Sequence, residues 1–174
     1  GFNSGSEAFH YLAAGESLVL TYTVRATDSS SGVDDQTVTI TITGTNDAPV
    51  LADTNLTISQ TEDDAAPVNG VTTGSTLVSA LISGITDVDA SNPKGIAITA
   101  QDGPGNWYYS INGGTNWTLF TPSETSARLL LADANTRIYF LSSAPNWQGS
   151  VTSALTLRAW DGSTGTNGGI ANVT

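Results

Sequence analysis

The chain has 174 residues, no cysteine, and 16 acidic against five Lys and Arg residues, so its formal net charge is −11. This balance argues against a nucleic-acid-binding protein and against an anionic membrane surface as partner, because both need clustered cations. The composition is poor in helix formers and rich in Thr, Ser, Gly, Val and Ile, which predicts an all-β fold with almost no helix. No apolar run is long enough to span a membrane and no signal peptide is present, so we expect no membrane insertion.

Two strands are predicted near the start of the chain. Residues 18–24 and 37–43 both alternate apolar with polar side chains, the pattern of half-buried strands with one inner face. The polar stretch 28–35 between them reads as a turn. The two strands should therefore form an antiparallel hairpin whose second strand turns its Val and Ile residues inward.

The stretch 44–51, Gly-Thr-Asn-Asp-Ala-Pro-Val-Leu, ends this hairpin. Gly44 stops the strand, and Pro49 removes an amide donor and favours extended backbone before it, so a short stiff connector is predicted. Asn46 and Asp47 place side-chain oxygens on this connector with no cation nearby. Such a pair suits a hard ion such as calcium, which takes six to eight oxygen ligands.

The rest of the chain predicts short strands separated by turns. Residues 78–85 read as a strand or a single helical turn, 107–120 as two aromatic strands around an Asn-Gly-Gly turn, and the acidic residues fall in loops. The strands recur about every ten residues, as in an all-β sandwich. The remaining predicted strands are 55–59, 95–100, 129–131, 136–141 and 155–160.

An internal repeat divides the chain into modules. Val24-Arg25-Ala26-Thr27-Asp28-Ser29-Ser30-Ser31-Gly32 recurs as Leu157-Arg158-Ala159-Trp160-Asp161-Gly162-Ser163-Thr164-Gly165. The first 43 residues supply too few strands to close a sandwich. We therefore expect the end of one module at 1–43, a linker at 44–54, and nearly all of a second module at 55–174 that stops near its last strand.

These residues resemble a known family. Leu12-Ala13-Ala14-Gly15-Glu16-Ser17-Leu18 and the run from Val38 through Gly44-Thr45-Asn46-Asp47-Ala48-Pro49-Val50 are similar to the C-terminal half of VCBS-type repeats. These are cadherin-like or Ig-like modules that occur in tandem in giant bacterial RTX adhesins. Residues 55–174 resemble a sister extender module through Asp87-Val88-Asp89, Gly95-Ile96-Ala97-Ile98 and Arg158-Ala159-Trp160-Asp161.

The resemblance implies tandem β-sandwich modules, the first incomplete at its N-terminal side, joined into a rod that calcium stiffens. By analogy with cadherin junctions, it implies these calcium ligands: Asp28, Asn46, Asp47, Glu62, Asp87, Asp89 and, for a further junction, Asp161. Asp34, Asp35, Asp63 and Asp64 are weaker candidates. The implied setting is a secreted protein at the bacterial cell surface, active in adhesion or biofilm formation. Its implied partners are neighbouring modules and, through other domains, a cell-surface glycan or protein.

Other interpretations of the same residues stay open. Asp and Asn populate turns for purely conformational reasons. The segment 110–117 resembles the Asp-box hairpin of sialidases, although a tight structural hairpin is the favoured explanation. A carbohydrate- or peptide-binding module could use aromatic faces, although core or cross-strand packing is the favoured explanation; the aromatic residues are Trp107, Tyr108, Tyr109, Trp117, Trp147 and Trp160. With one histidine and no cysteine, the chain lacks the usual residues of a nucleophile–base triad, so we expect that it is not an enzyme. The catalytic alternative that stays open is a glycosidase that uses a pair of carboxylates.

Overall fold

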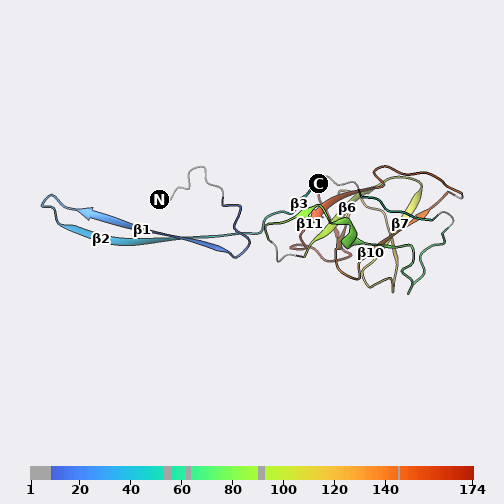
Figure 1. Ribbon diagram of the computed structural model, residues 1–174, viewed down its shortest axis with the longest axis horizontal. Helices are drawn as coiled ribbons and strands as arrows, with labels where there is room; N and C mark the ends of the chain where they lie inside the picture. Colours follow the sequence, from blue (N-terminus) through green and yellow to red (C-terminus); the bar gives the residue numbers. More distant parts are fainter. Residues whose placement is uncertain (1–8, 53–55, 62–63, 90–92, 145) are drawn as a thin grey trace. The chain divides into compact units, whose positions relative to one another are not determined.

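The computed structural model describes residues 9–52, 56–61, 64–89, 93–144 and 146–174, and it is all-β (Figure 1). Among these residues the only helix is η1, the single 3-10 turn Val78–Leu81, so the expected scarcity of helix is confirmed. Two compact units are present, Gly1–Asp47 with Val88–Ala90, and Ala48–Asp87 with Ser91–Thr174. No described helix has the length and apolar character needed to cross a membrane.

The first unit contains a long antiparallel ribbon of two strands, β1 (Ser17–Thr27) and β2 (Val33–Thr43). Their register pairs Leu18 with Ile42 and Leu20 with Ile40, which confirms the predicted hairpin. The turn is shorter than predicted, because β2 already begins at Val33. Arg25 pairs with Asp35 across the strands through two hydrogen bonds of 2.7 Å. This guanidinium holds the pKa of Asp35 below its usual value.

The apolar face of the ribbon is less buried than the alternation predicts. Ile40 and Ile42 are half-buried, but Val38 is 41% exposed and Tyr22, on the same face, is 48% exposed. The antiparallel pairing of the two strands is therefore as predicted, while the prediction of an inner face is wrong for Val38. The physical reason is that no third strand pairs with β1 or β2 among the described residues.

The second unit contains two four-stranded antiparallel sheets, in the strand orders β4-β10-β7-β8 and β11-β6-β9-β12. The predicted strands at 95–100, 107–120, 129–131, 136–141 and 155–160 are all present. A two-stranded sheet, β3-β5, accompanies them. The strands are β3 (Val50–Leu51), β4 (Thr76–Leu77), β5 (Ile85–Thr86), β6 (Gly95–Gln101), β7 (Gly105–Ser110), β8 (Thr118–Phe120), β9 (Ala127–Leu131), β10 (Arg137–Ser142), β11 (Leu155–Trp160) and β12 (Ile170–Ala171).

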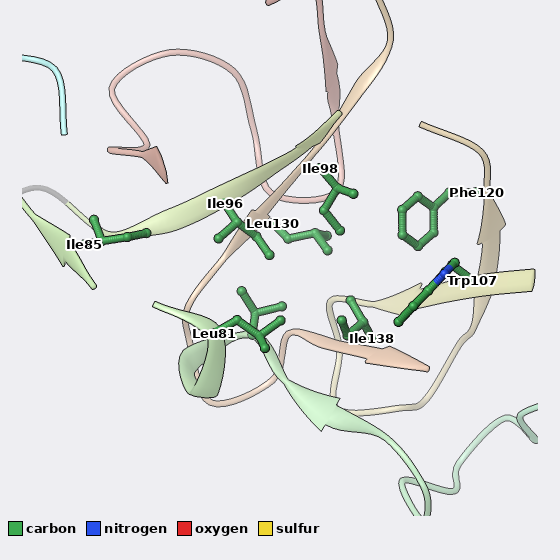
Figure 2. Packing of buried hydrophobic residues seen from close by; sticks show 9 residues of the cluster. Leu81, Ile85, Ile96, Ile98, Trp107, Phe120, Leu130 and Ile138 are labelled. Carbon is green, nitrogen blue, oxygen red and sulfur yellow. The ribbon is translucent and has the colours of Figure 1, made fainter. Parts of the chain in front are cut away.

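Both four-stranded sheets contribute to one hydrophobic core, as expected of a β-sandwich (Figure 2). Trp107, Phe120 and Ile138 come from one sheet, and Ile96, Ile98 and Leu130 come from the other. Val78 and Leu81 of η1 and Ile85 of β5 complete the cluster. Full burial of each such side chain contributes roughly 1.5–3 kcal/mol, so this core is the main source of stability in the second unit.

The structure corrects the prediction at residues 55–59 and selects between two predicted alternatives at residues 78–85. The prediction of a strand at 55–59 is wrong for its described part, since 56–59 has no strand; Asn55 lies outside the described residues. Ile58 nevertheless packs against the core cluster, so side-chain burial alone accounts for the alternation there. At 78–85 the structure selects the single turn, η1, followed by the short strand β5.

Candidate functional site

The carboxylate of Asp89 contacts two other segments of the first unit. It is 1% exposed and accepts two backbone hydrogen bonds, one to each oxygen. Ala14 N–H donates to Oδ1 at 2.5 Å, and Asp47 N–H donates to Oδ2 at 2.6 Å. Asp89 therefore holds together the turn at residues 13–16 and the connector at 46–47, two segments that lie far apart from it in sequence.

A close backbone contact positions this arrangement. Gly44 donates its N–H to the carbonyl of Glu16 at 2.8 Å and accepts from the N–H of Gly15 at 3.2 Å. A Cβ at position 44 would collide with the carbonyl oxygens of Ala13 and Leu12. Only glycine allows the connector to leave β2 this close to the turn, so Gly44 does more than end a strand.

Asp47 lies beside a shallow hollow in the first unit. Its side chain is 27% exposed, and its Oδ1 is 4.0 Å from Nδ1 of His10. The hollow has a volume of about 200 Å³ and is lined by Phe9, His10, Leu12, Ile42, Thr43, Gly44, Thr45 and Asp47. Next to it, the Asn46 amide donates to the carbonyl of Asp47 at 3.1 Å. Carboxylate, hydroxyl and carbonyl oxygens of this kind are what calcium prefers.

The described residues offer few ligands for a metal ion. Within the described parts of the chain, no three Asp, Glu, His or Cys side chains are grouped so as to hold an ion. Glu62, one of the predicted ligands, lies outside the described residues, as does Asp63. Asp89, which is 1% exposed, accepts the N–H groups of Ala14 and Asp47. The donor chemistry fits calcium, and the number of described donors is small.

The remaining predicted ligands take separate positions. Asp87 is half-buried directly after β5 in the second unit. Asp28 is exposed in the ribbon turn, and its Oδ1 accepts from the N–H groups of Ser30 and Gly32. Asp161, 5% exposed, follows β11, and its Oδ1 accepts from both the N–H and the hydroxyl of Ser163. Asp28 belongs to the first unit and Asp161 to the second.

Weaker acidic candidates have structural roles. Asp35 is paired with Arg25, as described above, and Asp34 is exposed within β2. Asp64 accepts a hydrogen bond from the side chain of Gln60 at 2.6 Å. Burial raises the pKa of the nearby Tyr139, and the Asp64 charge adds to this shift. Asp35 and Asp64 therefore have structural roles that do not require a bound ion.

The segment 110–117 forms a structural hairpin loop. The Ser110 hydroxyl accepts from Gly114 N–H at 2.9 Å, and the Asn112 side-chain oxygen accepts from Asn116 N–H at 3.0 Å. Trp117 then fixes a neighbouring loop, since its Nε1 donates to the carbonyl of Val71 at 3.1 Å. The loop's polar groups thus bond to one another and to this neighbouring loop.

The aromatic residues divide into core and surface groups. Trp107 and Trp160 are 3% and 8% exposed, so neither offers a face to a ligand. Trp147 is half-buried and lines, with Phe140, a groove of about 240 Å³ whose other lining residues are Gln60, Thr61, Ser142, Gln148 and Gly149. The buried Oε1 of Gln60 accepts no hydrogen bond from any described residue. Sequence reasoning did not single out Phe140 or Gln60, because nothing in their local sequence marks them as groove residues.

A scan against models of known protein families, a search of curated proteins and a search of solved structures each found no match to this chain.

Proposed function

We propose that this chain is a calcium-stiffened structural extender of a secreted bacterial RTX surface adhesin. In this proposal residues 1–43 are the C-terminal half of a VCBS-type, cadherin-like module, 44–54 is the calcium-binding linker, and 55–174 is a second Ig-like module. The role is mechanical and not enzymatic. Bound calcium fixes the linker, and the extended array projects a ligand-binding region from the cell surface for adhesion or biofilm formation.

The observation that carries the proposal is the position of Asp89 against the amide of Asp47. Two of the acidic residues that the resemblance assigns to calcium are thereby neighbours, although 42 residues separate them in sequence. In a chain of net charge −11 with few cations, a bound divalent ion would reduce the repulsion among the acidic side chains. Asn46, beside Asp47, adds a further oxygen of the type that calcium accepts.

Calcium titration tests the ion itself. Calorimetry in calcium should give saturable binding that weakens at least tenfold in Asp47→Asn, which keeps the size of the side chain and removes its charge. Asp102→Asn is the matched control, since Asp102 is an exposed acidic residue outside the proposed ligand set. Absence of calcium binding at millimolar concentration would overturn the proposal.

Scattering tests the mechanical role. With calcium the maximum dimension should be well defined, and with a chelator the chain should show a broader distribution of dimensions and a lower melting temperature. An unchanged maximum dimension together with an unchanged melting temperature would count against the extender role even if calcium binds.

A second candidate is a carbohydrate-binding module, and the groove at Trp147 favours it. An aromatic face beside amide side chains and a buried acceptor is a usual arrangement for binding a sugar ring. Glycan-array binding that is lost in Trp147→Ala and kept in Tyr11→Ala, a change at an exposed aromatic outside the groove, would select this candidate.

A further inference from the structure

Five pairs in the chain place an aspartate or an asparagine directly before a glycine. At such a pair the glycine nitrogen can attack Cγ of the preceding side chain and close a five-membered succinimide ring, since glycine has no Cβ to obstruct the approach. The reaction requires the nitrogen and Cγ to meet, so the folded backbone determines which pair reacts. The five pairs are Asn69-Gly70, Asp102-Gly103, Asn112-Gly113, Asp161-Gly162 and Asn167-Gly168.

The glycine nitrogens of the three Asn-Gly pairs are bonded elsewhere. Each of them donates its N–H to a backbone carbonyl of another segment, and each asparagine Oδ1 accepts a backbone N–H. A nitrogen bonded in this way must lose its hydrogen bond before it reacts with the side chain, which slows ring closure in the folded chain. The glycine bonds run from Gly70 to Gly114 at 2.7 Å, from Gly113 to Asn135 at 3.0 Å and from Gly168 to Leu129 at 2.8 Å.

The side chain of Asp161 is engaged by the residue that follows its glycine. Its Oδ1 accepts both the N–H and the hydroxyl of Ser163, at 2.9 and 2.7 Å. Asp161 is also only 5% exposed, so the water that must open a succinimide has little access to it. We therefore expect this pair to react slowly in the folded chain.

The Asp102-Gly103 pair has a different geometry. The N–H of Gly103 donates to Oδ1 of Asp102 at 2.7 Å, so the nitrogen is aimed at the carboxyl group that it would attack. Both residues are exposed, which admits water. Gly103 has a φ of +91°, a conformation that glycine adopts without strain. The N–H of Asp102 donates to the carbonyl of Ala154 at 3.0 Å, which fixes the backbone on the other side of the pair.

We propose that Asp102-Gly103 is a site of spontaneous isoaspartate formation and the first of the five pairs to react in the folded chain. The Asp102 carboxyl group reacts in its protonated form. The nitrogen of Gly103 forms a bond to Cγ, one C–O bond of the carboxyl group breaks, and the hydroxyl leaves with the amide proton as water. A second water then opens the succinimide. Hydrolysis at the side-chain carbonyl restores aspartate, and hydrolysis at the main-chain carbonyl leaves isoaspartate.

The modification falls where the chain passes between the two four-stranded sheets. Residues 102–104 connect β6, which belongs to one sheet, with β7, which belongs to the other. Isoaspartate adds one carbon atom to the main chain in this connection. The proposal is independent of the proposed function, because ring closure needs neither calcium nor a neighbouring module.

The first test follows the natural chain. The folded protein is incubated at neutral pH in water enriched in the heavy oxygen isotope, and its peptides are then separated and analysed by mass spectrometry. Each passage through the succinimide takes one oxygen atom from water. We expect the peptide that contains Asp102 to gain label, and to yield an isoaspartate form, at least about tenfold faster than the peptide that contains Asp161. A methyltransferase specific for isoaspartate identifies the new form.

The second test makes the chemistry equal at four sites. Asp102→Asn creates a fourth Asn-Gly pair, which differs from the natural three only in its flanking residues and its structural setting. In the folded variant, deamidation at position 102 should be at least about tenfold faster than at Asn69, Asn112 or Asn167. In urea the four rates should agree within about threefold, because the structural setting is lost. Asp102→Glu is the control that keeps the charge; it requires a six-membered ring and should remove the reaction.

Each of three outcomes overturns the proposal. One is equal labelling at Asp102 and Asp161 in the folded natural chain. Another is deamidation in Asp102→Asn that is no faster at position 102 than at the natural Asn-Gly pairs. The third is a rate excess at position 102 that persists in urea, since it would come from the local sequence and not from the fold.

Discussion

The carboxylate of Asp89 accepts the backbone N–H of Asp47 at 2.6 Å and is itself almost fully buried. Because its other oxygen accepts Ala14 N–H, the loss of this carboxylate leaves two part-buried N–H donors without their acceptor. Asp89→Asn places an amide NH₂ where one N–H donor now points, and we expect a loss of about 1–3 kcal/mol in stability. Chemical denaturation measures the loss, and hydrogen exchange should accelerate at Ala14 and Asp47.

The control for Asp89 is its neighbour. Val88 is 45% exposed, so Val88→Thr should change stability by less than about 0.5 kcal/mol. The loss in Asp89→Asn should persist in chelator, because the two hydrogen bonds need no ion. A loss seen only in calcium would mean that Asp89 acts through the metal alone.

The Arg25–Asp35 pair predicts a dependence on pH. The pKa of Asp35 is lowered in the folded ribbon, chiefly by its hydrogen bonds to Arg25. Its stabilising contribution is therefore fully present above its unfolded pKa of about 3.9 and is lost as the pH falls through the folded value. Amide protection in the ribbon should decrease between about pH 5 and pH 2 in the natural chain.

Removal of the titrating group should abolish that part of the pH response. In Asp35→Asn, ribbon protection should be lower at neutral pH and should vary less with acid. Asp34→Asn, at an adjacent exposed position, should keep the natural profile. An identical profile in all three proteins would show that the pair has no role in the ribbon.

Core truncation should separate the two units energetically. Leu130 and Ile138 are 0% and 1% exposed and pack between the two sheets of the second unit. Leu130→Ala is expected to cost about 2–5 kcal/mol through lost burial and a cavity. Val24→Ala on the ribbon, where the side chain is 53% exposed, should cost less than about 1 kcal/mol. Calorimetry of both variants makes the comparison.

The loop at 110–117 gives a prediction about backbone geometry. Gly114 has a φ of +82°, and a Cβ there would lie 2.8 Å from Cγ2 of Thr72. Gly114→Ala should therefore destabilise the second unit by more than about 1 kcal/mol. Gly70→Ala is a useful comparison, since its φ is +87° but no atom lies within 4 Å of the added Cβ. The difference between the melting temperatures of the two variants separates the steric clash of the added Cβ from the backbone strain of a positive φ.

Much of the fold could be read from local pattern. The alternation at 18–24 and 37–43 and the aromatic strands around Asn112-Gly113-Gly114 specify strands through side-chain period and turn chemistry, which are local properties. The strand predicted at 55–59 shows the limit of this reading. Ile58 is partly buried by the core, yet its backbone joins no sheet, and alternation alone cannot distinguish these two cases.

The repeated frame illustrates a local property that the structure reproduces. Asp28 and Asp161 hold equivalent places in the repeat, and each accepts the N–H of the serine two residues later, at 2.8 and 2.9 Å. A calcium role was predicted for both, and the turn contact accounts for the shared Asp-x-Ser spacing without one. Calcium binding at these two positions stays a prediction.

By itself the sequence determined the all-β class, most strand positions, the antiparallel hairpin and the acidic character, because each depends on neighbours in the chain or on composition. Only the tertiary structure decided that Asp89 is buried against Asp47 and Ala14, that Trp107 belongs to the core, and that Tyr22 and Val38 of the ribbon are exposed. These features depend on contacts between segments that are far apart in the sequence. Such contacts decide which side chains are buried and which groups they bond to, and the local sequence pattern does not.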